Sequence, residues 1–383
     1  MSKILSVVVA ISLLFFLSCV PKPKPPEAEL DTPEHHVSNG NKLFDNGKID
    51  DAFYEFNRAK ELSPKYCLAY VGLGLVYGAR GEYKKSLSSL EDADDYAKGN
   101  EEIVAVNIAY MRVYIMGEQK IHKNWLKEVE SKFKKAAKLS PDNSAPYFYM
   151  GEAYKNSFEF SQATAQFKKV LDLNKDFVKE ADKEYAAIQK IERAMPGSKV
   201  AQKIALLTSI TRADVAALFI EELKVDELFT KRTPKNFDTS FKSPDRLNDS
   251  TNETNKLKAN DIENHVLKVD IEAVIALGIK GLEPFSDGTF QPDKMINRAE
   301  FAMMIEDIIM KIKGDDSLST KFIGESSPFP DLRSDLPYFN AVMVCTTRNI
   351  METVNKSTGE FDPQALVSGA DAMLSIRTLK SQL

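Results

Sequence analysis

Residues 70–77 read YVGLGLVY, and residues 147–154 repeat the pattern as YFYMGEAY. In both stretches a Tyr, a large apolar residue, a Gly and a second Tyr recur at one spacing, which places them on one helix face. A second helical period follows each stretch, marked by Ser86, Leu90 and Ala93 and by Ala163, Phe167 and Val170. Because small residues let two helices approach closely, the pattern predicts antiparallel helix pairs that stack along the chain.

The same pattern extends in both directions from these stretches. An earlier unit carries Gly40, Leu43, Ala52, Phe56, Ala59 and Pro64. An irregular unit has its first helix at Val104–Met116 and its second at Val129, Phe133, Ala136 and Pro141, which predicts a longer loop at Gly117–Trp125. Asp176–Met195 has helical periodicity without a partner helix, as expected of a C-terminal cap. With a period of about 34 residues, residues 35–195 resemble a tetratricopeptide-repeat array.

The resemblance implies an α-solenoid that binds a protein partner along its concave face. Residues between the packing positions of the first helices are the groove candidates: Val71, Leu75, Gly78, Phe148, Glu152 and Lys155. The alternative is that a neighbouring unit, or the C-terminal domain folding back, buries some of them.

A second pattern occupies the C-terminal half. Residues 285–292 read FSDGTFQP, a tight loop with Asp-Gly at its turn, and residues 297–300 read NRAE. Asn297 is a good helix N-cap and Glu300 lies three residues on, so a capping box is expected. Residues 211–214 repeat the motif as TRAD without a preceding loop, and residues 329–363 form a third unit that ends in the altered motif VSGAD at 367–371. These units resemble S-layer homology repeats.

That resemblance implies a compact helical domain over residues 196–383, with pseudo-threefold repeats whose grooves bind peptidoglycan or a wall-attached polysaccharide. The glycan candidates carried over are Arg212 and Arg298, their acidic motif partners Asp214 and Glu300, and the aromatic Tyr338. A guanidinium can hold a carboxylate in two hydrogen bonds, and aromatic faces support sugar rings. The alternative is that Arg298 and Glu300 cap and brace a helix. The tryptophan that such repeats usually carry is missing, since Trp125 is the only one.

The N-terminus has the form of an export signal. Lys3 precedes an apolar run from Ile4 to Leu17, which is shorter than the roughly 20 residues of a membrane span. Ser18-Cys19 then resembles a bacterial lipobox, which implies removal of residues 1–18 and lipidation of Cys19. A plain signal peptide and an uncleaved anchor are the alternatives. Residues 19–34 contain five Pro and predict an extended tether of about 40 Å.

Composition narrows the function classes. The net charge of −5 does not favour nucleic-acid binding. Cys67 and Cys345 lie in apolar stretches and are expected to be buried free thiols, and residues 230–262 read as a polar surface loop. The chain shows no spaced His/Cys metal motif, phosphate-binding loop or nucleophile–base pairing, so neither a metal, a cofactor nor enzyme activity is expected.

The fold class predicted is therefore mainly all-α, with a solenoid followed by the S-layer-homology-like domain. The leading hypothesis is a non-catalytic lipoprotein that tethers or scaffolds, with a membrane, a protein and a wall polymer as partners. An assembly factor for a pilus or secretin and a glycan-modifying enzyme are the alternatives. Val20 after the lipobox Cys favours the periplasmic face of the outer membrane in a Gram-negative host.

Overall fold

The computed structural model describes residues 22–232 and 258–383, and all regular structure in these ranges is helical apart from two isolated β-bridges. The expected all-α class is confirmed. The chain forms two compact units, Met1–Tyr185 and Ala186–Leu383. The division falls inside the helix α10 (Val178–Ala194), near the end of which the Lys190 ammonium pairs with Asp371 at 2.8 Å within the second unit. The leader, Cys19 and most of the expected polar loop lie outside the described residues.

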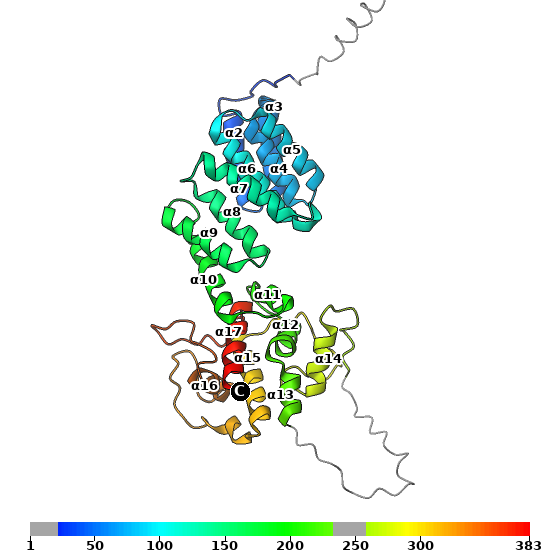
Figure 1. The fold of residues 1–383 in the computed structure, drawn as a ribbon, viewed down its shortest axis with the longest axis vertical. Coiled ribbons are helices and arrows are strands. Elements are labelled where there is room, and N and C mark those ends of the chain that lie inside the picture. Colours follow the sequence, from blue (N-terminus) through cyan, green and yellow to red (C-terminus); the bar gives the residue numbers. More distant parts are fainter. Residues whose placement is uncertain (1–21, 233–257) are drawn as a thin grey trace, which may run out of the picture. The chain divides into compact units, whose positions relative to one another are not determined.

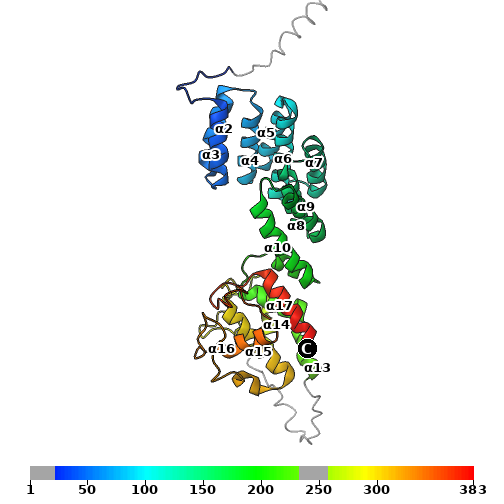
Figure 2. The ribbon, with the colours of Figure 1, turned by 90° about the vertical axis from the view of Figure 1, so that its left-hand side faces the viewer.

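In the described part of the first unit, four antiparallel helix pairs precede α10, whose second half belongs to the second unit (Figures 1 and 2). The helices are α2 (Pro33–Asp45), α3 (Ile49–Leu62), α4 (Cys67–Ala79), α5 (Tyr83–Tyr96), α6 (Gly99–Gly117), α7 (Trp125–Leu139), α8 (Ser144–Asn156), α9 (Phe160–Leu173) and α10 (Val178–Ala194). A 3-10 turn at Glu118–Lys120 and a short segment separate α6 from α7, which confirms the longer loop in the irregular unit. The first helices α2, α4, α6 and α8 contact one another in turn and form an inner row.

Glycine makes the close approach possible within the α4–α5 and α8–α9 pairs. A Cβ added at Gly74 would lie 2.6 Å from Cδ2 of Leu90, and one at Gly151 would lie 2.7 Å from Cε1 of Phe167. Both distances are too short for real carbon contacts, and Leu90 and Phe167 are fully buried. The pairs can therefore pack this tightly only where the first helix has no side chain.

The segment before α2 folds back on the first helix pair. The Lys24 amide donates to the Glu61 carbonyl at 2.8 Å, and the Lys24 ammonium pairs with the Glu61 carboxylate at 2.6 Å. The Arg58 guanidinium binds the Asp31 carboxylate through two nitrogens. Thr32 caps α2, which begins at Pro33. The expected tether therefore differs in its second half, because residues 24–32 are held against α3.

The second unit contains α11 (Lys199–Ala205), α12 (Arg212–Leu218), α13 (Val225–Arg232), α14 (Lys268–Leu277), α15 (Arg298–Lys313), α16 (Phe339–Thr347) and α17 (Gly369–Gln382). Its threefold character is visible in the backbone. Ile210, Ile296 and Val367 each precede the N-cap of a motif helix. The Ile210 amide donates to the Val367 carbonyl, that of Val367 to Ile296, and that of Ile296 to Ile210, each at 3.0 Å. This closed ring brings together the starts of α12, α15 and α17.

Cys67 and Cys345 are buried free thiols, as expected. Burial raises the pKa of Cys67 to about 12, so this thiol is unreactive at neutral pH. No helix of the described ranges is both long enough and apolar enough to cross a bilayer.

Candidate binding sites

Two pockets open along the inner row of the solenoid and share Arg112. One, of about 330 Å³, is lined by residues of α2, α4 and α6: Val37, Asn41, Phe44, Asp45, Leu68, Val71, Leu75, Ala105, Ile108, Ala109 and Arg112. The other, of about 360 Å³, is lined by residues of α6, α8 and α10: Arg112, Ile115, Met116, Phe148, Tyr149, Glu152, Glu180, Lys183 and Glu184. We call the two pockets together the Arg112 groove.

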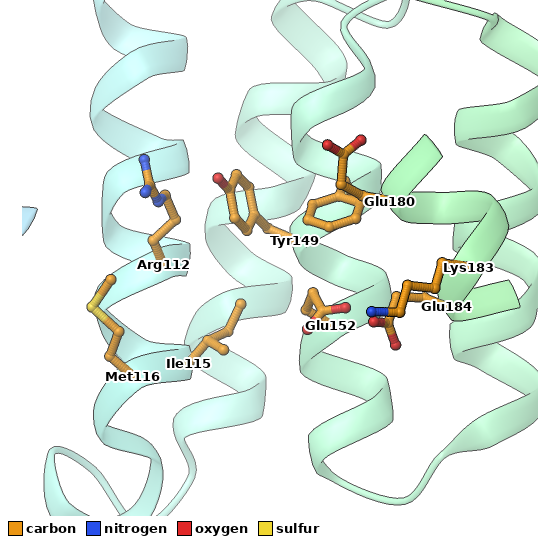
Figure 3. A pocket seen from close by; sticks show the side chains of 9 residues that line it. Arg112, Ile115, Met116, Tyr149, Glu152, Glu180, Lys183 and Glu184 are labelled. Carbon is orange, nitrogen blue, oxygen red and sulfur yellow. The ribbon is translucent and has the colours of Figure 1, made fainter. Parts of the chain in front are cut away.

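The α8 and α10 side of the second pocket carries charged side chains, among them Glu152, Lys183 and Glu184 (Figure 3). The Lys155 ammonium, which does not line the pocket, pairs with Glu152 at 2.8 Å and with Glu184 at 2.9 Å and so links α8 to α10. Burial opposes the charge on Lys155, but the two carboxylates outweigh it and raise the pKa of this ammonium. Lys155 is therefore held in these ion pairs rather than being a free cation.

The groove contains four of the six residues that the sequence suggested. Val71 and Leu75 line the first pocket, and Phe148 and Glu152 line the second. Lys155 lines neither of these two pockets but pairs with Glu152. Gly78 does not line either pocket, since it packs beneath Val113 and Met116 of α6. That these positions bind a partner stays a prediction.

Phe148 also has a structural role. Its ring stacks on Phe177 with centroids 4.7 Å apart and meets the buried ring of Phe167 edge-on at 5.8 Å. The ring is half-buried, so only part of it faces the pocket. Replacing it with a charged residue would therefore disturb packing as well as the groove.

Sequence reasoning missed Arg112, the residue at the junction of the two pockets. Its signal is the run AVNIAYMRVYI at residues 105–115, in which Arg112 is the only charged side chain. A lone charge within an apolar helix is unusual enough to single out.

In the second unit, the motif arginines lie inside the fold. Arg212 is 4% exposed, and its three nitrogens donate to the carbonyls of Phe290 at 2.8 Å, Gly281 at 2.5 Å and Glu283 at 2.9 Å. The guanidinium also lies over the Phe290 ring at 4.6 Å. Three of the five N–H groups of the guanidinium are thus engaged by one loop, and the side chain joins the first motif helix to the loop that precedes α15. Glycan contact at Arg212 stays a prediction.

Arg298 holds the same position at the start of the next motif helix, α15, and is bound in a similar way. It is 8% exposed and donates to the carbonyls of Phe361 at 2.8 Å and Glu352 at 2.5 Å. Unlike Arg212, it lines a pocket. Glycan contact at Arg298 therefore stays a proposal, beside its role in holding the third unit's loop.

The acidic motif residues form capping boxes. The Asp214 carboxylate accepts from the Thr211 amide at 2.9 Å, and that of Glu300 accepts from the Asn297 amide at 3.1 Å. Both caps satisfy donors at helix starts that would otherwise lack partners. Asp214 and Glu300 therefore brace the starts of α12 and α15, and their contact with a glycan stays a prediction.

The third motif has Gly369 where the others have Arg. A Cβ at Gly369 would lie 1.7 Å from the carbonyl oxygen of Ile204, at the end of α11. The Gly369 amide donates to the Leu207 carbonyl at 2.8 Å. The first repeat lacks the loop that binds an arginine in the other two repeats, and α11 lies in its place. It leaves no space for an arginine at position 369.

Within the C-terminal unit, a pocket of about 590 Å³ lies between the second and third of its three repeats, and we call it the cationic pocket. Its charged lining comprises Lys190, Arg193, Arg298, Lys356, Glu352 and Asp371. Lys190 pairs with Asp371 at 2.8 Å and Lys356 with Glu352 at 2.9 Å, so four cations face two carboxylates. Burial opposes ionisation of Asp371, but Lys190 and Ser368 outweigh it and lower its pKa. The pocket keeps a net positive charge.

Tyr338, the aromatic glycan candidate, lies elsewhere. It immediately precedes α16, is half-buried, and its hydroxyl accepts from the Gln364 side chain at 3.4 Å. It is not among the residues that line the cationic pocket.

Two carboxylates that sequence reasoning did not assign also brace the C-terminal unit. Asp261 and Asp331 each accept hydrogen bonds from two backbone amides of the turn loops.

No group of three or more metal-binding side chains occurs in the described ranges.

No curated protein matches the chain in sequence. Among solved structures, a thermophilic TPR protein of Thermus thermophilus shares 19% identity, with 52% of this chain and 96% of that chain covered and a TM-score of 0.36. A Pseudomonas aeruginosa protein described as pilF shares 14% identity, with 43% and 93% covered and a TM-score of 0.23.

Two family models match the chain. The TPR repeat model matches residues 40–91, and the S-layer homology domain model matches residues 270–302 and 328–373. The first family mediates contacts between proteins, and the second associates proteins with the cell surface or envelope. The solenoid hairpins and the ring of three motif helices agree with these matches, and the chain thus carries a TPR repeat region at residues 40–91 and, after it, an S-layer homology domain within residues 270–373.

Proposed function

We propose that this protein is a non-catalytic lipoprotein that tethers a partner protein to the cell wall. The lipid on Cys19 holds it in a membrane, the solenoid binds the partner, and the second unit binds peptidoglycan or a wall-attached polysaccharide. The observation that carries the proposal is the cationic pocket, because wall polymers that bear carboxylates or phosphates would be attracted to its uncompensated positive charge.

Two exposed cations of this pocket offer a direct test. Arg193 and Lys356 contribute charge without bracing the core, since among the described residues Arg193 bonds within its own helix and Lys356 pairs with the exposed Glu352. The double variant Arg193→Glu, Lys356→Glu should reduce binding to purified sacculi about tenfold, or ~1.4 kcal/mol, because it turns the pocket negative. Co-sedimentation of the full mature chain measures this.

A matched control uses Lys313→Glu with Lys321→Glu, which makes the same change in net charge on the same unit. Both side chains are exposed and do not line the pocket. Equal loss in the two double variants would mean that binding follows overall charge, and no pelleting of the wild type would remove the wall-binding role altogether.

A further inference from the structure

The guanidinium of Arg112 has an unusual environment. It lies 5.2 Å from the ring centroid of Phe44 on one side and 5.2 Å from that of Tyr149 on the other. Within the described residues, neither a carbonyl nor a carboxylate accepts a hydrogen bond from it. A guanidinium carries five N–H donors in a fixed plane. The two rings hold that plane in place and leave its donors free for an incoming acceptor.

Apolar surface continues on both sides of Arg112. Val37, Leu68 and Val71 line the pocket on one side, and Ile115 and Met116 line it on the other. Each pocket is large enough for at least one apolar side chain. A ligand along the inner row therefore meets an apolar pocket, a cation and a second apolar pocket in succession.

The charges farther out limit what the acceptor can be. Asp45 lines the first pocket, and Glu152, Glu180, Glu184 and one lysine, Lys183, line the second. Apart from Arg112, the lining therefore holds four carboxylates and one ammonium, which disfavours a polyanion such as a nucleic acid or a teichoic-type polymer. A single carboxylate can still bind Arg112, because it accepts two hydrogen bonds from the guanidinium and stays away from the carboxylates of both pockets.

We infer that the Arg112 groove binds a peptide segment in which one acidic side chain lies between apolar side chains. The carboxylate binds the guanidinium of Arg112, and the apolar side chains fill the two pockets. This inference rests on the proposed function, because it specifies which kind of partner the solenoid accepts.

Panning a random peptide library on phage against the immobilised mature chain tests the inference. The wild type should enrich peptides with Asp or Glu between apolar residues. A synthetic peptide from this set should bind Arg112→Met at least about tenfold more weakly, a loss of ~1.4 kcal/mol. Met retains contact with both rings, so the fold should be kept. Arg112→Glu should instead enrich peptides with Lys or Arg at the central position.

Arg80→Met is the matched control, because Arg80 also lies over a ring, that of Phe53 at 4.5 Å, but pairs with Asp50 outside the groove. It should bind the wild-type peptide unchanged. Enriched peptides that bind all variants equally would overturn the inference while leaving a peptide-binding solenoid. If no variant enriches any peptide, both the inference and the solenoid's proposed role fail.

Discussion

At the scale of single residues, Arg212 ties two repeats together through one side chain. Its three nitrogens bond to three carbonyls of the loop that precedes α15. A buried carbonyl that loses its donor still carries the free-energy cost of its desolvation. Removing the Arg212 side chain would therefore leave three carbonyls without this donor.

We therefore predict that Arg212→Met destabilises the second unit by about 3 kcal/mol, which corresponds to roughly 10 °C in the melting temperature. Arg333→Met is the control, because Arg333 is largely exposed and pairs only with Asp335. It should melt like the wild type. A stable Arg212→Met variant that no longer bound sacculi would support Arg212 as a glycan contact and contradict its role as a brace.

The sequence predicted the motif at Arg212 and made this arginine a glycan candidate, but it did not predict its bracing role. That role depends on the Gly281, Glu283 and Phe290 carbonyls, which lie about 70 to 80 residues away along the chain. Local pattern cannot specify such long-range partners. The altered third motif could have given a hint, because the absence of Arg at position 369 coincides with the absence of a loop in the first unit.

At the scale of elements, the repeat pattern predicted the helix pairs well, because each pair depends on small and large residues at fixed spacing. The segment before α2 was harder, since its composition alone favours an extended tether. Its docking depends on charges outside it: Asp31 binds Arg58 of α3, and the ring of His36 bridges Asp31 at 2.8 Å and Glu55 at 2.6 Å.

We predict that this docking is lost in acid. The Arg58 guanidinium, followed by the Glu27 amide, holds the pKa of Asp31 well below its usual range. A lowered pKa in the folded state stabilises docking above the unfolded value of about 4, and the gain disappears as the pH falls below it. Hydrogen exchange of the Lys24 amide, which bonds to Glu61, should therefore accelerate between about pH 4 and pH 2, beyond the intrinsic effect of pH.

Asp31→Asn should expose the Lys24 amide to exchange at every pH. The control Asp50→Asn removes a carboxylate of α3, which is largely exposed and pairs with Arg80 at the end of α4, so it should behave like the wild type. Protection of Lys24 that survives in Asp31→Asn would show that the docking does not depend on this ion pair.

At the scale of the whole molecule, sequence alone gave the order of the two binding modules, because both families have motifs at fixed spacing. It could not give the boundary inside α10. That boundary depends on Lys190, whose partner Asp371 is supplied by the last helix of the chain. The Arg112 groove was equally beyond local pattern, since its wall combines α2, α4, α6, α8 and α10.

The docked segment also bears on the proposed anchor. Lys24, the first docked residue, lies five positions after Cys19, so the chain between them reaches at most roughly 17 Å. A lipid on Cys19 would therefore keep the first helix pair much closer to the membrane than a free tether of about 40 Å.

We predict that Cys19→Ala moves the protein from the membrane fraction to the soluble periplasm, because the acyl chains supply the membrane affinity and no described helix can replace them. Cys67→Ala is the matched control: it removes a buried thiol of α4, and the protein should stay with the membranes. Separating the membranes by buoyant density should place the wild type with outer-membrane markers. Retention of Cys19→Ala in the salt-washed membrane pellet would mean that something other than this lipid holds the protein there, and co-migration of the wild type with inner-membrane markers would overturn the proposed location.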